Sequence, residues 1–308
     1  MNLYRILRNG SEKTYADLAF NAKGDQIVSV AGDPDYMLTI WKWKQELILL
    51  RSKAFSQDVY SCSFSPTEGV LFTCGMGHIK FWKMSSTFTG LKLQGTIGKF
   101  GNSELTDIVA YVQLADGKVL SSTETGNMLL WDGGIIKCEL SARGKRPCHA
   151  GRIECMILSE AEVITAGEDG YVRVWDLETI DNADVVETGL ANAPRIFEME
   201  PMEEILVAKD VKIKSAVRFP NSPHFLIQDQ QGQLLKLDTN KRYTDKIFSF
   251  HSGIVSGMDT SPLFHKMATI GPDGTLRFFD YRTKATVSKL SYAQGGTAIK
   301  WLPPVPFH

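Results

Sequence analysis

The chain has 308 residues, of which 43% are hydrophobic and 22% are charged, and its formal net charge is −1 at pH 7. This length fits one large repeat domain or two ordinary domains, and the composition is that of a folded globular protein. The near-zero charge argues against electrostatic attraction to nucleic acid or to an anionic membrane, and no apolar run approaches the ~20 residues of a membrane span.

Six short segments along the chain share one ending, in which apolar residues alternate with others and a bulky residue closes the run. In chain order they are Leu38–Trp41, Ile79–Trp82, Met128–Asp132, Tyr171–Asp176, Leu234–Asp238 and Leu276–Asp280. Apolar residues at every second position indicate strands with one buried face. The last bulky residues stand at positions 41, 82, 131, 175, 237 and 279, so a strand-forming unit recurs along the chain.

The clearest unit is a hairpin in the middle of the chain. Two apolar runs, Val163–Ala166 and Tyr171–Trp175, flank the sequence Gly167-Glu168-Asp169-Gly170. The Asp-Gly pair predicts a tight turn, because such turns need a positive φ that Gly adopts freely and Asp tolerates. An isolated two-stranded hairpin is marginal in water, so this hairpin is expected to belong to a larger sheet.

Repeats of about 40–45 residues that end in Trp-Asp resemble those of the WD-repeat family, whose members are β-propellers of four-stranded blades. The resemblance implies an all-β fold: a WD40 β-propeller with six complete four-stranded blades and strands of an incomplete seventh. It implies a single domain over residues 1–302 and a tail at 303–308. The expected blades cover residues 14–50, 59–93, 108–140, 152–209, 215–250 and 254–290.

Two short segments lie outside these six blades. Leu3–Leu7 is expected to be the outermost strand of the last blade, and Thr297–Leu302 the innermost strand of a seventh. The other strands of that seventh blade are missing from the sequence. We therefore expect either a fragment or truncated isoform of a longer protein, or a ring that closes with six blades and leaves the tail outside.

Residues 179–201 predict an acidic insertion with few features of a strand. Its acidic residues are Asp181, Asp184, Glu187, Glu198 and Glu200. Glu203–Lys209 is then expected to supply the outer strand of the fourth blade. Connections of this length are usually functional or disordered, and composition does not decide between the two. Upstream, the basic loop Ala142–His149 is suited to an acidic partner, although a solvated loop is the simpler interpretation.

Two histidines lie where the family resemblance implies a buried polar network. In WD-repeat blades such a histidine bonds a strand Ser or Thr and lies near a turn aspartate and the blade's Trp. The matching residues are His149, Thr165, Asp169 and Trp175 in the fourth blade, and His251, Thr269, Asp273 and Phe279 in the sixth. Met76, Thr125 and Gln231 stand where the aspartate would be in the second, third and fifth blades.

A hydroxyl, an imidazole and a carboxylate are also the parts of a catalytic triad. The structural interpretation is favoured here, because the set recurs from blade to blade and its members satisfy one another's hydrogen bonds without substrate. We therefore predict no catalytic residues and a protein that is not an enzyme.

The cysteines and glycines do not form a recognisable ligand site. Five cysteines are present, and they are Cys62, Cys74, Cys138, Cys148 and Cys155. They lack the close pairs typical of metal sites, which favours reduced thiols in a cytoplasmic protein. The glycines at Gly75–His78 and Gly295–Gly296 lack the Lys of a P-loop and a strand-to-helix context. We predict no metal, no cofactor and no small-molecule substrate.

Several longer runs resemble one branch of the WD-repeat family, the cilia- and flagella-associated proteins. They are Gly32–Lys44, Ser56–Val59, Gly77–Met84, Phe88–Gly95, Gly126–Trp131, Asp169–Asp176 and Phe248–Gly253. This resemblance implies a non-catalytic scaffold of the ciliary or flagellar axoneme, in the tether complex that positions inner-arm dynein on doublet microtubules for flagellar motility and sperm flagellum organisation. The implied partners are inner-arm dynein heavy chains, other axonemal WD-repeat proteins and, as an open alternative, tubulin.

Other functions stay open at this point. The run Gly77–Trp82 is also similar to the echinoderm-microtubule-associated-like family, which implies a cytoplasmic microtubule-associated protein. A general protein-interaction propeller is a second alternative, and a propeller hydrolase that uses the His sets is a third. A fold alone does not identify a partner, so the contact residues are not predicted.

Overall fold

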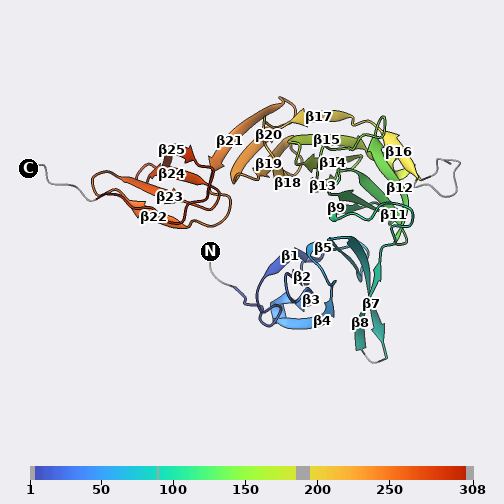
Figure 1. Cartoon of the computed structure of the whole chain (residues 1–308). Helices are drawn as coiled ribbons and strands as arrows, with labels where there is room; N and C mark the ends of the chain where they lie inside the picture. The colour runs from blue at the N-terminus through green and yellow to red at the C-terminus, as the bar shows by residue number, and fades with distance from the viewer. Residues whose placement is uncertain (1–3, 89, 185–194, 303–308) are drawn as a thin grey trace, which may run out of the picture. The chain divides into compact units, whose positions relative to one another are not determined.

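The computed structural model of the chain is described for residues 4–88, 90–184 and 195–302. These residues fall into two compact units, Met1–Asp210 and Val211–His308, and each is described by itself. Strands β1–β25 dominate both units, and the described helices are the short α1 (Leu177–Asp181) and a 3-10 turn at Trp43–Gln45 (Figure 1). Within the described residues, neither helix has the length and hydrophobicity that crossing a membrane requires.

The first unit contains four sheets. The first sheet is β1 (Tyr15–Phe20), β2 (Ile27–Ala31), β3 (Met37–Lys42) and β4 (Leu47–Lys53), and the second is β5 (Val59–Phe64), β6 (Val70–Gly75), β7 (His78–Thr87) and β8 (Gly90–Ile97). The third is β9 (Ile108–Gln113), β10 (Val119–Thr123), β11 (Met128–Asp132) and β12 (Ile135–Ala142), with β16 (Ile196–Met199) added at its edge. The fourth is β13 (Ile153–Leu158), β14 (Glu162–Gly167), β15 (Tyr171–Asp176) and β17 (Glu203–Leu206).

The second unit contains two further sheets of the same kind. The fifth sheet is β18 (Ile213–Arg218), β19 (His224–Asp229), β20 (Gln233–Asp238) and β21 (Tyr243–Ser249), and the sixth is β22 (Gly257–Thr260), β23 (Lys266–Ile270), β24 (Thr275–Asp280) and β25 (Ala285–Ser291). In all six sheets, strands that follow one another in the order of the sheet pair antiparallel, apart from the added β16.

The hairpin between β14 and β15 forms as its sequence predicts. Val163 pairs with Trp175 and Ala166 with Val172, and Gly170 takes a φ of +80° in the turn. The alternation of side chains then places Val172 in the core, where its side chain is 1% exposed. The local rules of turn and alternation are therefore enough to specify this part of the fold.

The bulky aromatics of the third strands pack between neighbouring sheets of the first unit. Trp82, Trp131 and Trp175 are at most 2% exposed, and each belongs to a core cluster that also contains residues of the preceding sheet. Trp82, for example, shares its cluster with Val28 and Ile40 of the first sheet. A buried ring of this size removes roughly 150–250 Å² from water, so these tryptophans act as wedges between neighbouring sheets.

The first strands of successive sheets also contact one another within the first unit, β1 with β5 and β9 with β13. Asp17 of β1 accepts hydrogen bonds from the Ser61 hydroxyl at 3.0 Å and from the Cys62 N–H at 2.8 Å. Four-stranded sheets that meet along their first strands and wedge aromatics between their faces are the construction of a β-propeller. The all-β, WD40-type fold class is thus confirmed, while the number of blades and the single domain over 1–302 stay predictions.

The two segments predicted to start and finish the ring are not strands, so these two predictions are wrong. Tyr4 and Arg5 instead contact the connection between β3 and β4, where the Tyr4 ring packs edge-on to Trp43 and Arg5 pairs with Glu46 at 3.2 Å. These side-chain contacts hold the segment without a hydrogen-bonded ladder. Residue Leu3 and the tail at 303–308 lie outside the described residues.

Thr297–Leu302 also forms no strand, but it lies where the next sheet's first strand would lie. The Trp301 N–H donates to Asp259 of β22 at 2.8 Å, and the Trp301 ring nitrogen donates to the Asp259 carbonyl at 3.3 Å. Asp259 therefore holds this segment as Asp17 holds β5. The segment lacks a ladder because no strand of the described chain pairs with it.

The predicted insertion has more structure than its composition suggests. Residues 185–194 lie outside the described residues, but α1 and β16 flank them. β16 pairs in parallel with β12, Ile196 beside Glu139 and Met199 beside Ala142. At the other end, the Lys118 ammonium lies 3.2 Å from Asp181 and 3.3 Å from Asp184. Strand β17 then supplies the outer strand of the fourth sheet, as predicted.

Candidate protein-interaction surfaces

The polar set of the fourth sheet forms the predicted network. The His149 Nδ1 lies 2.9 Å from the Asp169 carboxylate, and its Nε2 lies 2.7 Å from the Thr165 hydroxyl. The Trp175 indole N–H donates to the same hydroxyl at 2.8 Å. The sequence did not reveal a fifth member, Arg173, whose guanidinium donates to Asp169 at 2.7 Å.

The protonation states of this network fit a buried structural role. Burial lowers the pKa of His149 and thereby favours the neutral imidazole. Burial alone would raise the pKa of Asp169, but the hydrogen bonds of His149 and Arg173 and the positive charge of Arg173 hold it well below its usual range. Thr165 is 0% exposed and its hydroxyl is shared by Trp175 and His149, so it is not presented to a substrate.

The sixth sheet repeats the network with different surroundings. The His251 Nδ1 lies 3.1 Å from Asp273 and its Nε2 lies 2.8 Å from the Thr269 hydroxyl. Phe279 stands in the place of the tryptophan, as predicted, and its side chain has no indole N–H to donate. Thr275 is an unpredicted member, because its hydroxyl lies 2.9 Å from Asp273.

The second and third sheets, which lack the turn aspartate, keep half of the network. Each of their tryptophans donates its indole N–H to a strand hydroxyl, Trp82 to Thr73 at 3.0 Å and Trp131 to Ser121 at 2.8 Å. In the second sheet, an aspartate from outside its strands replaces the missing one, because Asp107 accepts from the Gly77 N–H at 3.0 Å. No spacing rule in the sequence connects Asp107 to that turn.

The cysteines and acidic residues do not form a metal site in the parts of the chain that the structure describes, where no group of three possible ligands comes together. Four of the five thiols are buried, and Cys155 is partly exposed. Burial raises the pKa of both Cys138 and Cys148 to about 12. These two thiols are therefore protonated at neutral pH and serve as small apolar packing groups.

The basic loop before the fourth sheet is exposed but is partly held by the insertion. The Gly144 N–H donates to the Glu198 carboxylate at 2.8 Å, and the Arg146 guanidinium donates to the Arg143 carbonyl at 3.1 Å. Arg143 and Lys145 extend into solvent. An acidic partner for this loop stays a prediction.

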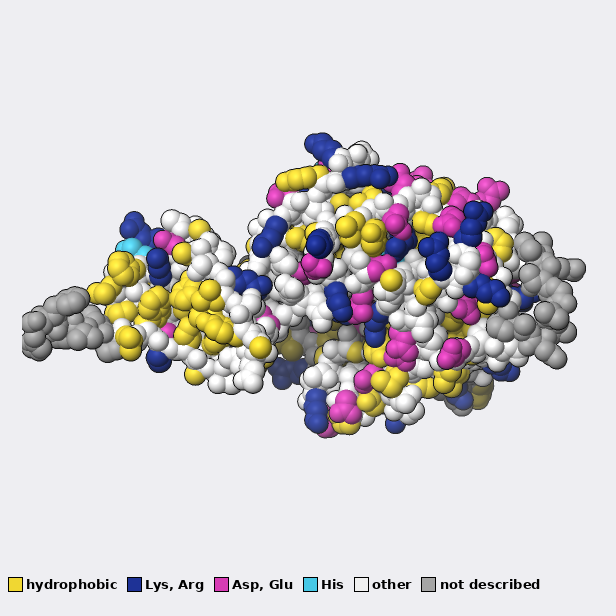
Figure 2. Space-filling view, turned by 45° about the horizontal axis from the view of Figure 1, so that its top comes forward, with side chains coloured by type: hydrophobic (Ala, Val, Ile, Leu, Met, Phe, Trp, Pro, Cys, Tyr) yellow, Lys and Arg dark blue, Asp and Glu magenta, His cyan; other side chains and the backbone are white. Residues whose placement is uncertain are grey.

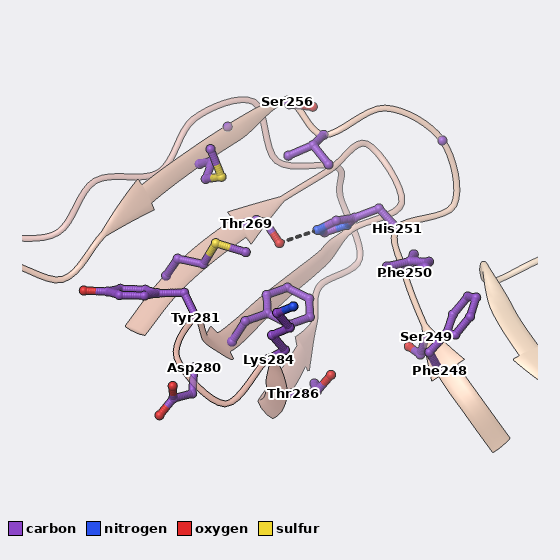
Figure 3. A pocket seen from close by; sticks show the side chains of 16 residues that line it. Phe248, Ser249, Phe250, His251, Ser256, Thr269, Asp280, Tyr281, Lys284 and Thr286 are labelled. Carbon is purple, nitrogen blue, oxygen red and sulfur yellow. Dashed lines mark hydrogen bonds between the residues drawn. The ribbon is translucent and has the colours of Figure 1, made fainter. Parts of the chain in front are cut away.

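A large apolar pocket lies in the second unit, beside the sixth sheet. Its volume is about 930 Å³, and Figure 3 shows its floor of apolar side chains. Phe248 and Phe250, at the end of β21, line one side, and Tyr281 lies on the other. His251 reaches the pocket from its bond with Thr269. The sequence analysis did not predict this pocket, because its walls come from segments that no local pattern links.

Apolar side chains also cover the outside of the sixth sheet. Figure 2 shows them gathered over β22–β25, and they include Met258, Phe264, Tyr281, Val287 and Leu290. Met258 is 61% and Phe264 is 63% exposed. Contiguous apolar surface of this kind marks a contact surface for another chain segment or protein.

The repeats and the sheets together are similar to those of one class of proteins, the WD-repeat proteins. The family model described as "WD domain, G-beta repeat" matches residues 48–83 and 143–176. The match at 143–176 contains the His149 network, and the match at 48–83 contains β5, β6 and Trp82.

The chain is also similar over nearly its whole length to particular members of this class. It is 46% identical to "Cilia- and flagella-associated protein 44" of Mus musculus over 97% of the chain and 16% of that protein. The protein of the same name from Chlamydomonas reinhardtii is 42% identical over 98% of the chain and 18% of that protein. The chain thus spans less than a fifth of the length of these relatives.

A more distant similarity covers half of the chain. "Echinoderm microtubule-associated protein-like 2" of Homo sapiens is 29% identical over 53% of the chain and a quarter of that protein, 25%. Its name is that of the family that the run Gly77–Trp82 resembles, which is the alternative given in the sequence analysis.

Proposed function

We propose that the chain is a non-catalytic scaffold of the ciliary or flagellar axoneme. In this function it forms part of the tether complex that positions inner-arm dynein on doublet microtubules, and so serves flagellar motility and sperm flagellum organisation. Its partners are inner-arm dynein heavy chains and other axonemal WD-repeat proteins.

One observation carries this proposal, the 46% identity to a cilia- and flagella-associated protein over 97% of the chain. The similarity includes both the strand cores and the connections between them, since nearly every residue lies within the matched region. A likeness of this extent supports a shared cellular setting more strongly than the WD repeats do, because WD repeats occur in proteins of many functions.

The geometry supports a scaffold in two ways. Within each polar set that resembles a catalytic triad, the members bond to one another in the interior. Thr165, for example, bonds with Trp175 and His149. The surface of the sixth sheet, in contrast, exposes apolar side chains such as Met258 and Phe264. Rigid sheets with apolar contact surface suit a protein that holds other proteins in place.

Proximity labelling from the tagged chain in ciliated cells tests the proposal. We expect labelled inner-arm dynein heavy chains and axonemal WD-repeat proteins, and an untethered labelling enzyme in the same cells is the control. Labelling of ubiquitin-ligase or nuclear proteins alone would contradict the proposal. The full-length relative, tagged at the same site, shows whether residues outside this chain are needed for the same result.

A second candidate function is microtubule binding by the chain itself. The observation behind it is the 29% identity to an echinoderm microtubule-associated protein-like protein over 53% of the chain. Co-sedimentation with bare microtubules separates the two functions. Strong binding by the chain alone favours this second candidate, whereas its absence together with axonemal labelling favours the tether.

A further inference from the structure

The second sheet ends in a two-stranded arm. β6 begins at Val70, which pairs with Lys83, but β7 continues for four more residues to Thr87. β8 follows β7 over the same distance, from Thr87 opposite Gly90 to Lys83 opposite Gln94. Beyond Lys83 the sheet therefore has only β7 and β8, which extend away from its other strands (Figure 1).

The two faces of this arm differ in chemistry. Directly paired residues share a face, so Met84 with Leu93 and Ser86 with Leu91 lie on one side. Met84 and Leu93 pack against the core between the first two sheets, which makes this the apolar face. The opposite face carries Lys83 and Lys92. Neither ammonium forms an ion pair with any residue that the structure describes.

One edge of the arm offers unused backbone hydrogen bonds. The Met84 N–H donates to the Gly69 carbonyl at 2.6 Å, and this is the last bond between β7 and the β6 side. Backbone groups of alternate residues point to the same edge of a strand. Gly69 lies beside the Met84 carbonyl, so Ser86 is the next residue whose backbone groups face the edge that β6 has left open. The backbone groups of Ser85 and Thr87 face β8.

A cleft of about 330 Å³ lies at the base of the arm, on its apolar face. Met84 and Leu91 line it from the arm, and Phe64 at the end of β5 and Pro66 in the turn after it line a second side. Polar residues of the turn between β1 and β2 form the remaining wall. An exposed ion pair between Lys23 and Glu68, 2.9 Å apart, lies at its rim. Gly69 and Met84 both line the cleft, so it lies beside the point where β7 continues past β6.

We propose that an extended segment of a partner protein adds a strand to the open edge of β7. Its backbone bonds to the N–H and carbonyl of Ser86. Because side chains alternate along a strand, one set of its side chains enters the cleft beside Met84 and Leu91. The other set lies beside Lys83 on the opposite face, with Lys92 one strand further away on β8. The partner segment therefore alternates apolar and acidic residues.

Charge decides between this partner and other occupants. Lys83 lies on the strand next to the added one, and Lys92 lies one strand further away on the same face. Cross-strand pairs of opposite charge stabilise such pairing, whereas like charges oppose it. A basic or uncharged alternating segment lacks this contribution. The inference rests on the geometry of the arm alone, so it holds whichever cellular assembly contains the protein.

Binding of designed peptides to the whole chain tests the proposal. The probe is a fluorescent peptide of about ten residues that alternates valine with glutamate, and its matched controls replace glutamate by lysine or carry N-methyl groups along one edge. Fluorescence anisotropy measures the affinity. We expect the acidic peptide to bind at least about tenfold more tightly than either control, since each loses a charge or hydrogen-bond contribution.

Two variants of the chain sharpen the test. Ser86→Pro removes one N–H from the open edge, where proline is tolerated, and is expected to weaken binding about tenfold without lowering the thermal midpoint. Lys83→Glu together with Lys92→Glu is expected to reverse the preference toward the lysine peptide. Lys44→Glu, an exposed lysine of the 3-10 turn after β3, is the matched control and leaves binding unchanged.

Three results overturn the proposal. One is the absence of binding by the acidic peptide, and another is binding that Ser86→Pro leaves intact. The third is a dimer of the chain in analytical ultracentrifugation that Ser86→Pro dissociates, because that result assigns the open edge to a second copy of this chain.

Discussion

Trp175 shows how much one residue contributes to this fold, since it combines packing with a hydrogen bond. Its ring is 0% exposed in the core between the third and fourth sheets, and its indole N–H donates to Thr165. Thr165 in turn contacts His149, which contacts Asp169. A change at the tryptophan therefore affects both the apolar cluster and the polar network behind it.

Two substitutions separate these contributions. Trp175→Ala is expected to lower the free energy of unfolding by about 3–5 kcal/mol, because it leaves a cavity in the core. Trp175→Phe keeps most of the ring and loses mainly the hydrogen bond, so we expect a loss of about 1–2 kcal/mol. Urea denaturation of both variants checks this order, and equal losses would contradict the separate role of the bond.

The His149 network also makes stability depend on pH. The unfolded chain protonates this imidazole near its ordinary pKa of 6.5, whereas burial lowers the pKa of His149 in the folded chain. As pH falls below about 6.5, the unfolded state binds more protons, and stability falls. Asp169 acts in the same direction below its ordinary pKa of 3.8, because its folded pKa is lower.

We therefore expect the thermal midpoint to fall between pH 7 and pH 5, and His149→Gln to flatten this dependence. His78 contributes a similar term, since burial lowers its pKa too, so His78→Gln is the matched comparison. Midpoints measured by differential scanning calorimetry across this range check the prediction. An unchanged slope in both variants would show that neither buried histidine controls it.

At the scale of single elements, β16 is the addition that distinguishes the third sheet from the other five. It pairs in parallel with β12, where the Glu139 N–H donates to the Arg195 carbonyl at 2.7 Å. Phe197 packs against the core cluster and Met199 is buried. β16 thus covers the edge of β12, which would otherwise expose unpaired backbone groups.

Phe197→Pro is expected to detach β16, because proline removes a backbone N–H and its ring clashes in a paired strand. Amide hydrogen exchange at Glu139 should then become faster, and stability should fall by about 1–3 kcal/mol. Glu200→Ala, an exposed position just after the strand, is the control. Unchanged exchange at Glu139 would contradict the covering role of β16.

At the scale of the whole molecule, the two units differ in how much of their own apolar surface is buried. The core clusters of the first unit join successive sheets, as in the cluster of Phe72, Ile108 and Trp131. The sixth sheet of the second unit instead exposes Met258, Phe264 and Leu290. This difference matches a scaffold that keeps part of its surface for contact with other protein.

The exposed surface predicts how the isolated chain behaves. We expect it to bind an apolar fluorescent dye, and the double variant Met258→Gln and Phe264→Ser to bind clearly less dye. Because both side chains are exposed, stability should change by no more than about 0.5 kcal/mol. Leu47→Gln, an exposed residue of the first sheet, serves as the control. Equal dye binding by all variants would show that the dye binds to an apolar surface other than that of the sixth sheet.

Much of the fold could be predicted because its rules are short in range. The turn at Asp169-Gly170, the alternation through Val172 and Val174 and the recurring tryptophans follow from φ preferences and from a period of two. The His149 and His251 networks were predicted as well, because the resemblance to WD-repeat proteins implies them at these positions. These features depend on residues within a few tens of positions of one another.

The amino-acid sequence alone thus determined the strands, their turns and the aromatic wedges. Only the tertiary structure decided that Asp107 accepts a hydrogen bond from the turn at Gly77 and that β16 pairs with β12. The structure also decided that β7 extends beyond β6, which leaves an open edge beside a cleft. It also decided against strands at Tyr4–Leu7 and Thr297–Leu302. The physical reason is that alternation encodes which face of a strand is buried, whereas pairing depends on which distant surfaces meet.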